Sequence, residues 1–242
     1  MNIGFSESWV SDFVPRFGID LSCSPLWLDE YHDPVGLAAL GFRSNPDGTE
    51  RAWLGGFGLA PEIRGQGFSA PLMDALLTEC EQRPVTTIQL EVLTTNIKAM
   101  HVYESAGFEI GRKVATLTSP YRMGYSEELN SDVLPWDVIE PQHEVLPVWQ
   151  RQFPWAMEGG GQVLVTDYSW LRFRPAGKRI LLFDAEFGTQ DDLALAVYDL
   201  QARFPDCQLS LANEPVGTPL YAALTTLDWV ESAPQWEMVY KM

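Results

Sequence analysis

The fold of this chain is decided by the stretch Arg64-Gly65-Gln66-Gly67-Phe68-Ser69. It follows an apolar run at residues 53–60 and precedes a helix-like run at residues 71–80. A strand, a glycine-rich turn and a helix start in that order form an anion site. Glycines let the backbone approach a ligand, and the unpaired N–H groups of a helix N-terminus point toward it. The guanidinium of Arg64 adds a planar cation suited to phosphate. The sequence therefore predicts a site for a cofactor that carries phosphate.

The residues around the two glycines argue against two other phosphate-binding motifs. A nucleoside-triphosphate loop needs Gly-Lys-Ser/Thr after its glycines, whereas Phe68 and Ser69 follow Gly67. A dinucleotide fingerprint needs a third glycine, and Ala70 stands at that position. A glycine-rich turn often serves only the backbone conformation. Whether this one binds a cofactor therefore has to be inferred from the rest of the chain.

Length and composition limit the class of protein. The 242 residues suffice for one large domain or two ordinary ones. No apolar run reaches membrane-spanning length and no basic-then-apolar leader is present, so we expect a soluble, cytoplasmic protein without a membrane partner. The three cysteines are scattered, which predicts neither a disulfide framework nor a Cys-X-X-Cys metal site.

The chain is strongly acidic, with a formal net charge of -17. Such a charge repels the phosphates of nucleic acid, so we expect no nucleic-acid partner. The charge is compatible with a small cationic substrate. It also accounts for solubility by itself, which is the simpler interpretation.

The chain divides near its middle. Residues up to 117 alternate between strand-like and helix-like runs, and a polar, proline-containing stretch at 118–142 predicts a linker. We therefore predict domains at residues 1–125 and 135–242. In the second half we expect strands at 162–168, 179–184, 207–211 and 237–241, and helices at 191–204 and 218–227.

The two halves repeat one order of elements. The first runs through strand 53–60, a helix from 71, strand 87–93, helix 97–106 and the pair Gly107-Phe108. The second runs through strand 179–184, helix 191–204, strand 207–211, helix 218–227 and the pair Asp228-Trp229. The matching order indicates a tandem duplication. Two unrelated α/β halves are the alternative.

Two segments of the first half resemble the signatures of the GCN5-related N-acetyltransferase (GNAT) family. Residues 59–69 match its Arg/Gln-x-x-Gly-x-Gly/Ala loop, with Pro61 ahead of the loop and Ser69 in the last small position. The second signature is matched by Leu90-Glu91-Val92 and then by Asn96, Ala99, Tyr103 and Gly107-Phe108. The close match spans residues 35–114, and weaker similarity to two-domain members extends over the whole chain.

The resemblance implies a fold class. We expect an α/β (α+β) protein with two tandem GNAT-like domains. Each would be a mixed, mostly antiparallel twisted sheet flanked by helices.

The resemblance also implies acetyl-CoA as cosubstrate. The pantetheine arm would lie where the strand before the loop separates from its neighbour, against main-chain groups of Phe57 and Leu59. Asn96 would contact the same arm, although its place before Ile97 also fits a plain helix N-cap. The pyrophosphate would bind the N–H groups of Arg64, Gly65, Gln66, Gly67, Phe68 and Ser69.

Two residues are candidates for acid–base catalysis of acyl transfer. The resemblance makes Tyr103 the general acid that protonates the leaving sulfur; a tyrosine on an apolar helix face also serves as core. Glu91, on the strand beside the cleft, is the candidate general base, with a hydrogen-bonded strand carboxylate as the alternative.

The three histidines do not form a metal site. His101 lies two residues from Tyr103 and hence on another helix face, while His32 and His143 lie in polar, loop-like segments. No pair has ligand spacing, so we expect no metal.

The second half lacks the glycine loop. Residues 185–192 contain one glycine, no leading arginine and three acidic residues, which repel phosphate. When Asp228-Trp229 is aligned with Gly107-Phe108, Leu224 takes the place of Tyr103. We therefore expect a degenerate C-terminal domain without cofactor and one active site per chain.

The acceptor pocket is less regular in sequence. Its candidate walls are residues 5–20 and 24–31, together with aromatic residues that suit a cation by cation–π attraction but that more often form the core of a domain interface. These aromatic residues are Tyr121, Tyr125, Trp136, Trp149, Phe153 and Trp155. We expect an N-acetyltransferase, monomeric or homodimeric, that acts on an amine of a small molecule or peptide. The alternative is a non-catalytic acyl-CoA-binding or sensing protein.

Overall fold

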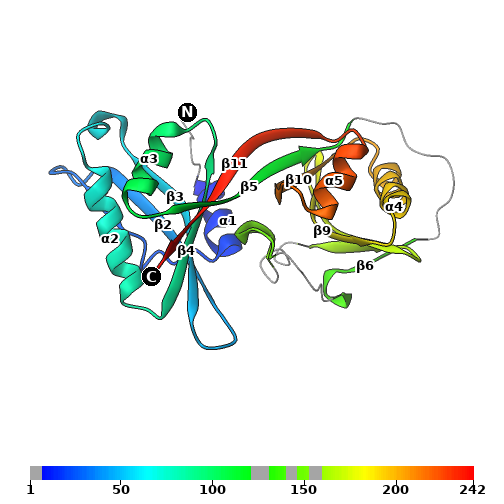
Figure 1. Ribbon diagram of the computed structural model, residues 1–242, viewed down its shortest axis with the longest axis horizontal. Helices are drawn as coiled ribbons and strands as arrows, with labels where there is room; N and C mark the ends of the chain where they lie inside the picture. The colour runs from blue at the N-terminus through cyan, green and yellow to red at the C-terminus, as the bar shows by residue number, and fades with distance from the viewer. Residues whose placement is uncertain (1–6, 121–130, 140–145, 153–159) are drawn as a thin grey trace. The chain divides into compact units, whose positions relative to one another are not determined.

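The structure is a computed structural model that describes residues 7–120, 131–139, 146–152 and 160–242, with the backbone alone at residues 7–10 and 12. The chain divides into two compact units (Figure 1). Unit 1 comprises residues up to 112 together with 236–242, and unit 2 comprises residues 113–235. The candidate residues Phe5, Tyr121, Tyr125, His143, Phe153 and Trp155 lie outside the described residues.

Unit 1 is built from alternating strands and helices, and its strands follow the order β1-β2-β3-β4-β11-β5. Pairing is antiparallel between β1 and β2 and between β2 and β3, and parallel between β3 and β4. Its helices are α1 (Glu7–Phe17), α2 (Ser69–Glu81) and α3 (Ile97–Ser105). Its strands are β1 (Leu26–Leu28), β2 (Pro34–Ser44), β3 (Glu50–Leu59), β4 (Val85–Leu93), the start of β5 (Glu109–Thr118) and the end of β11 (Val230–Lys241).

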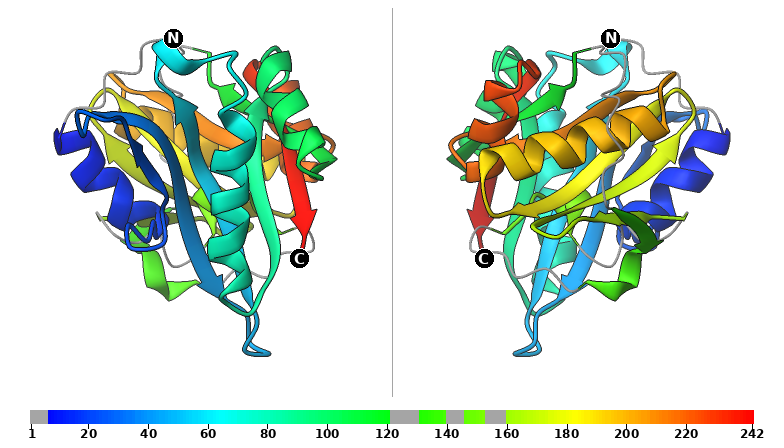
Figure 2. Two further views of the ribbon diagram at one scale, coloured as in Figure 1. Left: turned by 90° about the vertical axis from the view of Figure 1, so that its left-hand side faces the viewer. Right: turned by 90° about the vertical axis from the view of Figure 1, so that its right-hand side faces the viewer.

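The core of unit 1 forms because alternate residues of each strand face the same helices. Leu54 and Leu90 pack with Leu72 and Leu76 of α2 and with Tyr103 of α3. Figure 2 (left) shows α2 and α3 on this face. The residues between them on the strands face the opposite side, where α1 lies.

The C-terminal end of the chain completes unit 1. Glu237 of β11 accepts two hydrogen bonds from Arg112 of β5, Nε to Oε1 and Nη2 to Oε2, each 3.0 Å long. The N–H of Met242 donates to the carbonyl of Thr86 at 3.0 Å. The predicted strand at 237–241 is confirmed as the end of β11, and it groups with unit 1 rather than with the second half of the chain.

Unit 2 repeats the architecture, with strands in the order β11-β5-β10-β9-β8-β7-β6. Strands β6 to β9 are antiparallel neighbours, and β9 and β10 are parallel. Its helices are α4 (Gln190–Arg203) and α5 (Pro219–Thr226), with 3₁₀ turns η2 (Trp136–Val138) and η3 (Trp149–Arg151). Its own strands are β6 (Asp132–Pro135), β7 (Gln162–Val165), β8 (Ser169–Ala176), β9 (Arg179–Phe187) and β10 (Gln208–Pro215).

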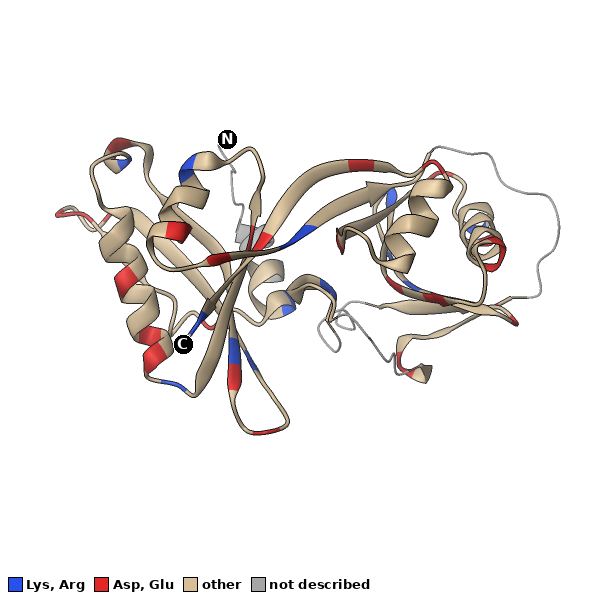
Figure 3. Ribbon diagram, viewed as in Figure 1, with Lys and Arg blue, Asp and Glu red and all other residues tan. Residues whose placement is uncertain are grey.

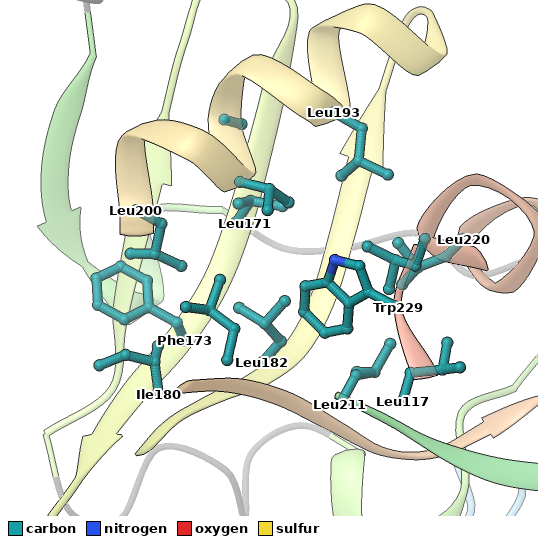
Figure 4. Close-up of a cluster of buried hydrophobic side chains, with 14 of the residues drawn as sticks. Leu117, Leu171, Phe173, Ile180, Leu182, Leu193, Leu200, Leu211, Leu220 and Trp229 are labelled. Atoms are coloured by element: carbon teal, nitrogen blue, oxygen red, sulfur yellow. The ribbon is translucent and has the colours of Figure 1, made fainter. Parts of the chain in front are cut away.

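The core of unit 2 lies between its strands and α4 and α5 (Figure 2, right). In Figure 4 the side chains of Leu171 and Phe173 from β8 and Leu182 from β9 face Leu193 and Leu200 of α4.

No helix among the described residues is long and apolar enough to cross a membrane.

The end of α3 in unit 1 has the same geometry as the end of α5 in unit 2. The N–H of Phe108 donates to the carbonyl of Tyr103 at 3.0 Å, and that of Trp229 donates to Leu224 at 3.1 Å. The preceding residues, Gly107 and Asp228, have φ values of 98° and 62°. The predicted tandem arrangement and the α/β class with mostly antiparallel, helix-flanked sheets are therefore confirmed.

The predicted linker at 118–142 was wrong in part. Residues 132–138 form β6 and η2, and Trp136 is buried against Phe183. This short strand was not predicted because it contains Asp132 and Pro135, and both residue types are rare in strands. The predicted domain limits of 1–125 and 135–242 stay a prediction. They place all of β11 in the second domain, whereas residues 236–242 group with unit 1.

Candidate active site

Strands β3 and β4 stop pairing before either strand ends. Their parallel register runs from Glu50↔Val85 to Trp53↔Gln89. Strand β3 then continues to Leu59 and β4 to Leu93 without further pairing to each other. Phe57 and Leu59 lie on this separated part of β3, where backbone groups on the β4 side are available to a ligand.

The loop after β3 is exposed and contains two glycines. Gly65 and Gly67 have φ values of 73° and 86°, a left-handed backbone that favours glycine. Helix α2 starts two residues after Gly67, and no side-chain hydrogen bond caps it. Its first turn holds no acidic residue, and the acidic positions of α2 lie further along the helix (Figure 3). A helix start of this kind attracts anions.

Two side chains shape the loop. The Nε of Arg64 donates to the carbonyl of Leu59 at 2.8 Å, so the side chain folds back onto the end of β3. The Nε2 of Gln66 donates to the carbonyl of Glu62 at 2.8 Å. The Nη groups of Arg64 make no hydrogen bond to any described residue and stay available to an anion.

Asn96 caps helix α3. Its Oδ1 accepts from the N–H of Ala99 at 3.3 Å. The helix-cap interpretation is therefore confirmed, and the exposed Asn96 still has its amide nitrogen for a ligand.

Tyr103 is buried in the core of unit 1. The ring lies 6.0 Å from that of Phe57 and 5.9 Å from that of Phe108, centroid to centroid. The hydroxyl makes no hydrogen bond to a described residue. Burial raises the pKa of Tyr103 to about 12, so the phenol keeps its proton at neutral pH.

Glu91 lies on the other face of the sheet from Tyr103. Its neighbours Leu90 and Val92 point into the core that contains Tyr103, so Glu91 points away from it. The Nε1 of Trp53 donates to Oε2 of Glu91 at 2.8 Å. The two predicted catalytic side chains therefore lie on opposite faces of the sheet.

Trp53 was missed by the sequence analysis. The rings of Phe13 and Phe17 from α1 lie 6.2 and 5.6 Å from its indole. The alternation of side chains along a strand could have identified it. Ala52 and Leu54 are core residues, so Trp53 between them lies on the opposite face, together with Glu91.

The remaining candidates lie elsewhere. Trp136 and Trp149 belong to unit 2 and are buried. His32 has a φ of 67° in an exposed turn, and His101 is exposed on α3. The described residues contain no cluster of histidine, cysteine or acidic side chains able to hold a metal.

The start of α4 in unit 2 is closed to anions. Thr189 and Asp192 form a capping box, in which Oδ2 of Asp192 accepts from the N–H and the hydroxyl of Thr189 at 2.7 Å each. A carboxylate of the chain thus occupies the position that an anion takes at an uncapped helix start.

Comparison with known proteins agrees with this geometry. Residues 4–108 match the model of the acetyltransferase (GNAT) family. Over 59 residues the chain is 37% identical to the [ribosomal protein bS18]-alanine N-acetyltransferase of Escherichia coli (strain K12). The match covers 24% of this chain and 40% of that enzyme.

Solved structures share the fold over most of the chain. A tandem GNAT protein from the clavulanic acid biosynthesis pathway has a TM-score of 0.62 at 14% identity, covering 95% of this chain and 87% of that one. A GCN5-related N-acetyltransferase from Sphaerobacter thermophilus has a TM-score of 0.60 at 10% identity, covering 89% and 79%. Residues 4–108, which lie in unit 1, carry the match to the acetyltransferase (GNAT) family, and the tandem GNAT fold extends over most of the chain.

Proposed function

We propose that the chain is an acetyl-CoA-dependent N-acetyltransferase that acetylates an amine of a small molecule or peptide. The observation that carries the proposal is the end of pairing at Trp53↔Gln89 directly before the exposed loop of Gly65 and Gly67. An extended thioester arm and a pyrophosphate fit these two neighbouring features, one on unpaired strand edges and one at an uncapped helix start.

The residues that would hold acetyl-CoA follow from this geometry. Backbone groups of Phe57 and Leu59 and the amide of Asn96 would bind the pantetheine arm. The N–H groups of residues 64–69 and the Nη groups of Arg64 would bind the pyrophosphate. The cosubstrate supplies an activated acetyl group as its thioester.

Tyr103 and Glu91 have complementary tasks on the two faces of the sheet. Tyr103 holds a proton at neutral pH and donates it, or a hydrogen bond, to the sulfur that leaves the carbonyl carbon. Glu91, oriented by Trp53, accepts the proton that the attacking amine loses, directly or through water. A thioester held between the separated strands is reachable from both faces of the sheet. Tyr103 and Glu91 can therefore act on it from opposite sides.

A thiol-release assay tests the proposal. The purified chain is incubated with acetyl-CoA and a panel of small amines and peptides, and free CoA thiol is measured. Amine-dependent thiol release supports the N-acetyltransferase. Tight CoA binding without release on any amine favours the non-catalytic acyl-CoA-binding alternative, and absence of binding contradicts both.

A further inference from the structure

Strands β9 and β10 of unit 2 separate as β3 and β4 do in unit 1. Their parallel register runs from Arg179↔Gln208 to Leu182↔Leu211, and β9 then continues to Phe187 and β10 to Pro215. The register of β10 with β5 shifts between Leu211 and Glu214, and Asn213 there has a φ of 51°. Unit 2 thus retains the separated strands on which an extended ligand would lie.

A side chain of unit 2 bridges these separated strands. Nη1 of Arg151 donates to the carbonyl of Phe183 on β9 at 3.1 Å, and Nη2 donates to the carbonyl of Asn213 on β10 at 3.5 Å. Nη2 also lies 2.5 Å from Oε2 of Glu214. Arg151 and Glu214 are 7% and 4% exposed, so this ion pair is shielded from water.

Glu214 extends the network to the next helix. Its Oε1 accepts a hydrogen bond from the hydroxyl of Thr218. Thr218 is the N-cap of α5, and its Oγ1 accepts from the N–H of Tyr221 at 3.1 Å. In unit 1 the corresponding helix start is Asn96, whose amide nitrogen is left for a ligand.

We propose that Arg151 is the internal occupant of the strand separation in unit 2, in the place that the acyl arm takes in unit 1. With Asp192 at the start of α4, the chain's own side chains satisfy the groups that acetyl-CoA satisfies in unit 1. The comparison with unit 1 rests on the proposed function, whereas the fitted guanidinium site rests on the contacts of Arg151 alone.

Removal of Arg151 should create a binding site for its missing fragment. The substitution Arg151→Ala leaves the Glu214 carboxylate buried without its counter-ion, together with two unpaired carbonyls. Loss of one partner of a buried ion pair is strongly destabilising, and in a domain of this size should lower the melting temperature by roughly 6–20 °C. Ethylguanidinium is the fragment that the substitution removes, and it should restore part of this loss.

The experiment is a thermal melt of Arg151→Ala with millimolar ethylguanidinium. Ethylammonium, a cation without the planar fork, is the matched control, and wild type is melted in both. Stabilisation of the variant by ethylguanidinium alone supports the fitted site. An equal effect of both cations, or none, overturns it.

Arg151→Lys covers the case in which Arg151→Ala does not fold. An ammonium group cannot reproduce the fork that joins two carbonyls and a carboxylate. A melting temperature below that of wild type supports the bridge, and an unchanged one overturns it.

Binding stoichiometry gives a separate readout. Isothermal titration with acetyl-CoA should give one site per chain. Two sites would contradict the proposal that Arg151 occupies the strand separation of unit 2. If no acetyl-CoA binds, the proposed function fails, while the ethylguanidinium result still decides the role of Arg151.

Discussion

The indole Nε1 of Trp53 donates a 2.8 Å hydrogen bond to Oε2 of Glu91, across the point where β3 and β4 cease to pair. Trp53 is itself held by the rings of Phe13 and Phe17 from α1. A rigid aromatic donor thus orients the candidate base beside the separated strands.

Substitution of the candidate base tests its role. Glu91→Gln should lower kcat/KM by about a hundredfold at neutral pH, a magnitude typical of general base catalysis. The loss should shrink as the pH approaches the pKa of the amine, because the ammonium form no longer has to be deprotonated before attack. Trp53→Phe, which removes the orienting donor, should show the same pH pattern with a smaller loss. The exposed strand carboxylate Glu109 provides the control Glu109→Gln. Equal losses at every pH would remove Glu91 from proton transfer.

Tyr103→Phe tests the proton donor. The variant keeps the ring contacts with Phe57 and Phe108 but loses the hydroxyl, so kcat should fall by about a hundredfold or more while acetyl-CoA affinity stays nearly unchanged. Because the pKa of Tyr103 is raised to about 12, the wild-type rate should show no loss of this proton up to pH 10. Wild-type turnover in the variant would exclude the hydroxyl from the mechanism.

The backbone of the loop is tested by alanine at its glycines. Gly65→Ala or Gly67→Ala forces a side chain into a left-handed backbone, which costs about 1–2 kcal/mol or rearranges the cradle. The dissociation constant for acetyl-CoA should rise at least about fivefold. Gly48→Ala is a matched control, since Gly48 has a φ of 83° with open space around it in the β2–β3 turn. Equal affinity in all three variants would contradict a cradle at residues 64–69.

Asp184 makes the stability of unit 2 depend on pH. Burial raises the pKa of Asp184 from 3.8 to about 7. Between about pH 4 and 7 the folded chain holds a proton that the unfolded chain has lost, so stability falls as the pH rises through this window. Asp184→Asn removes the ionisable group, and its advantage in melting temperature over wild type should grow from pH 5 to pH 8. Asp132→Asn, at an exposed position, should show no such trend; a pH-independent difference for Asp184→Asn would refute the shift.

Local features of the fold were predictable from the sequence. The strand, loop and helix around residues 53–81 were predicted because positive φ selects glycine at positions 65 and 67 and apolar residues mark the core face. The repeat was predicted because Gly107-Phe108 and Asp228-Trp229 end equivalent helices.

Long-range features were not predictable in the same way. The return of β11 to unit 1 depends on pairing between distant segments, and nothing local in residues 236–242 specifies the partner. Arg151 was missed because two of its partners are backbone carbonyls, which leave no mark on the sequence, and its third partner, Glu214, is distant along the chain. Glu91 was predicted beside the cleft, but its separation from Tyr103 required the direction of each side chain.

Hydrogen exchange with and without acetyl-CoA tests the central claim most directly. Binding at unit 1 should slow exchange at the amides of residues 54–69, on the separated part of β3 and in the loop, and leave residues 183–192 of unit 2 unchanged. Protection at 183–192, or no protection at 54–69 at saturating acetyl-CoA, would contradict the placement of the acetyl-CoA site in unit 1.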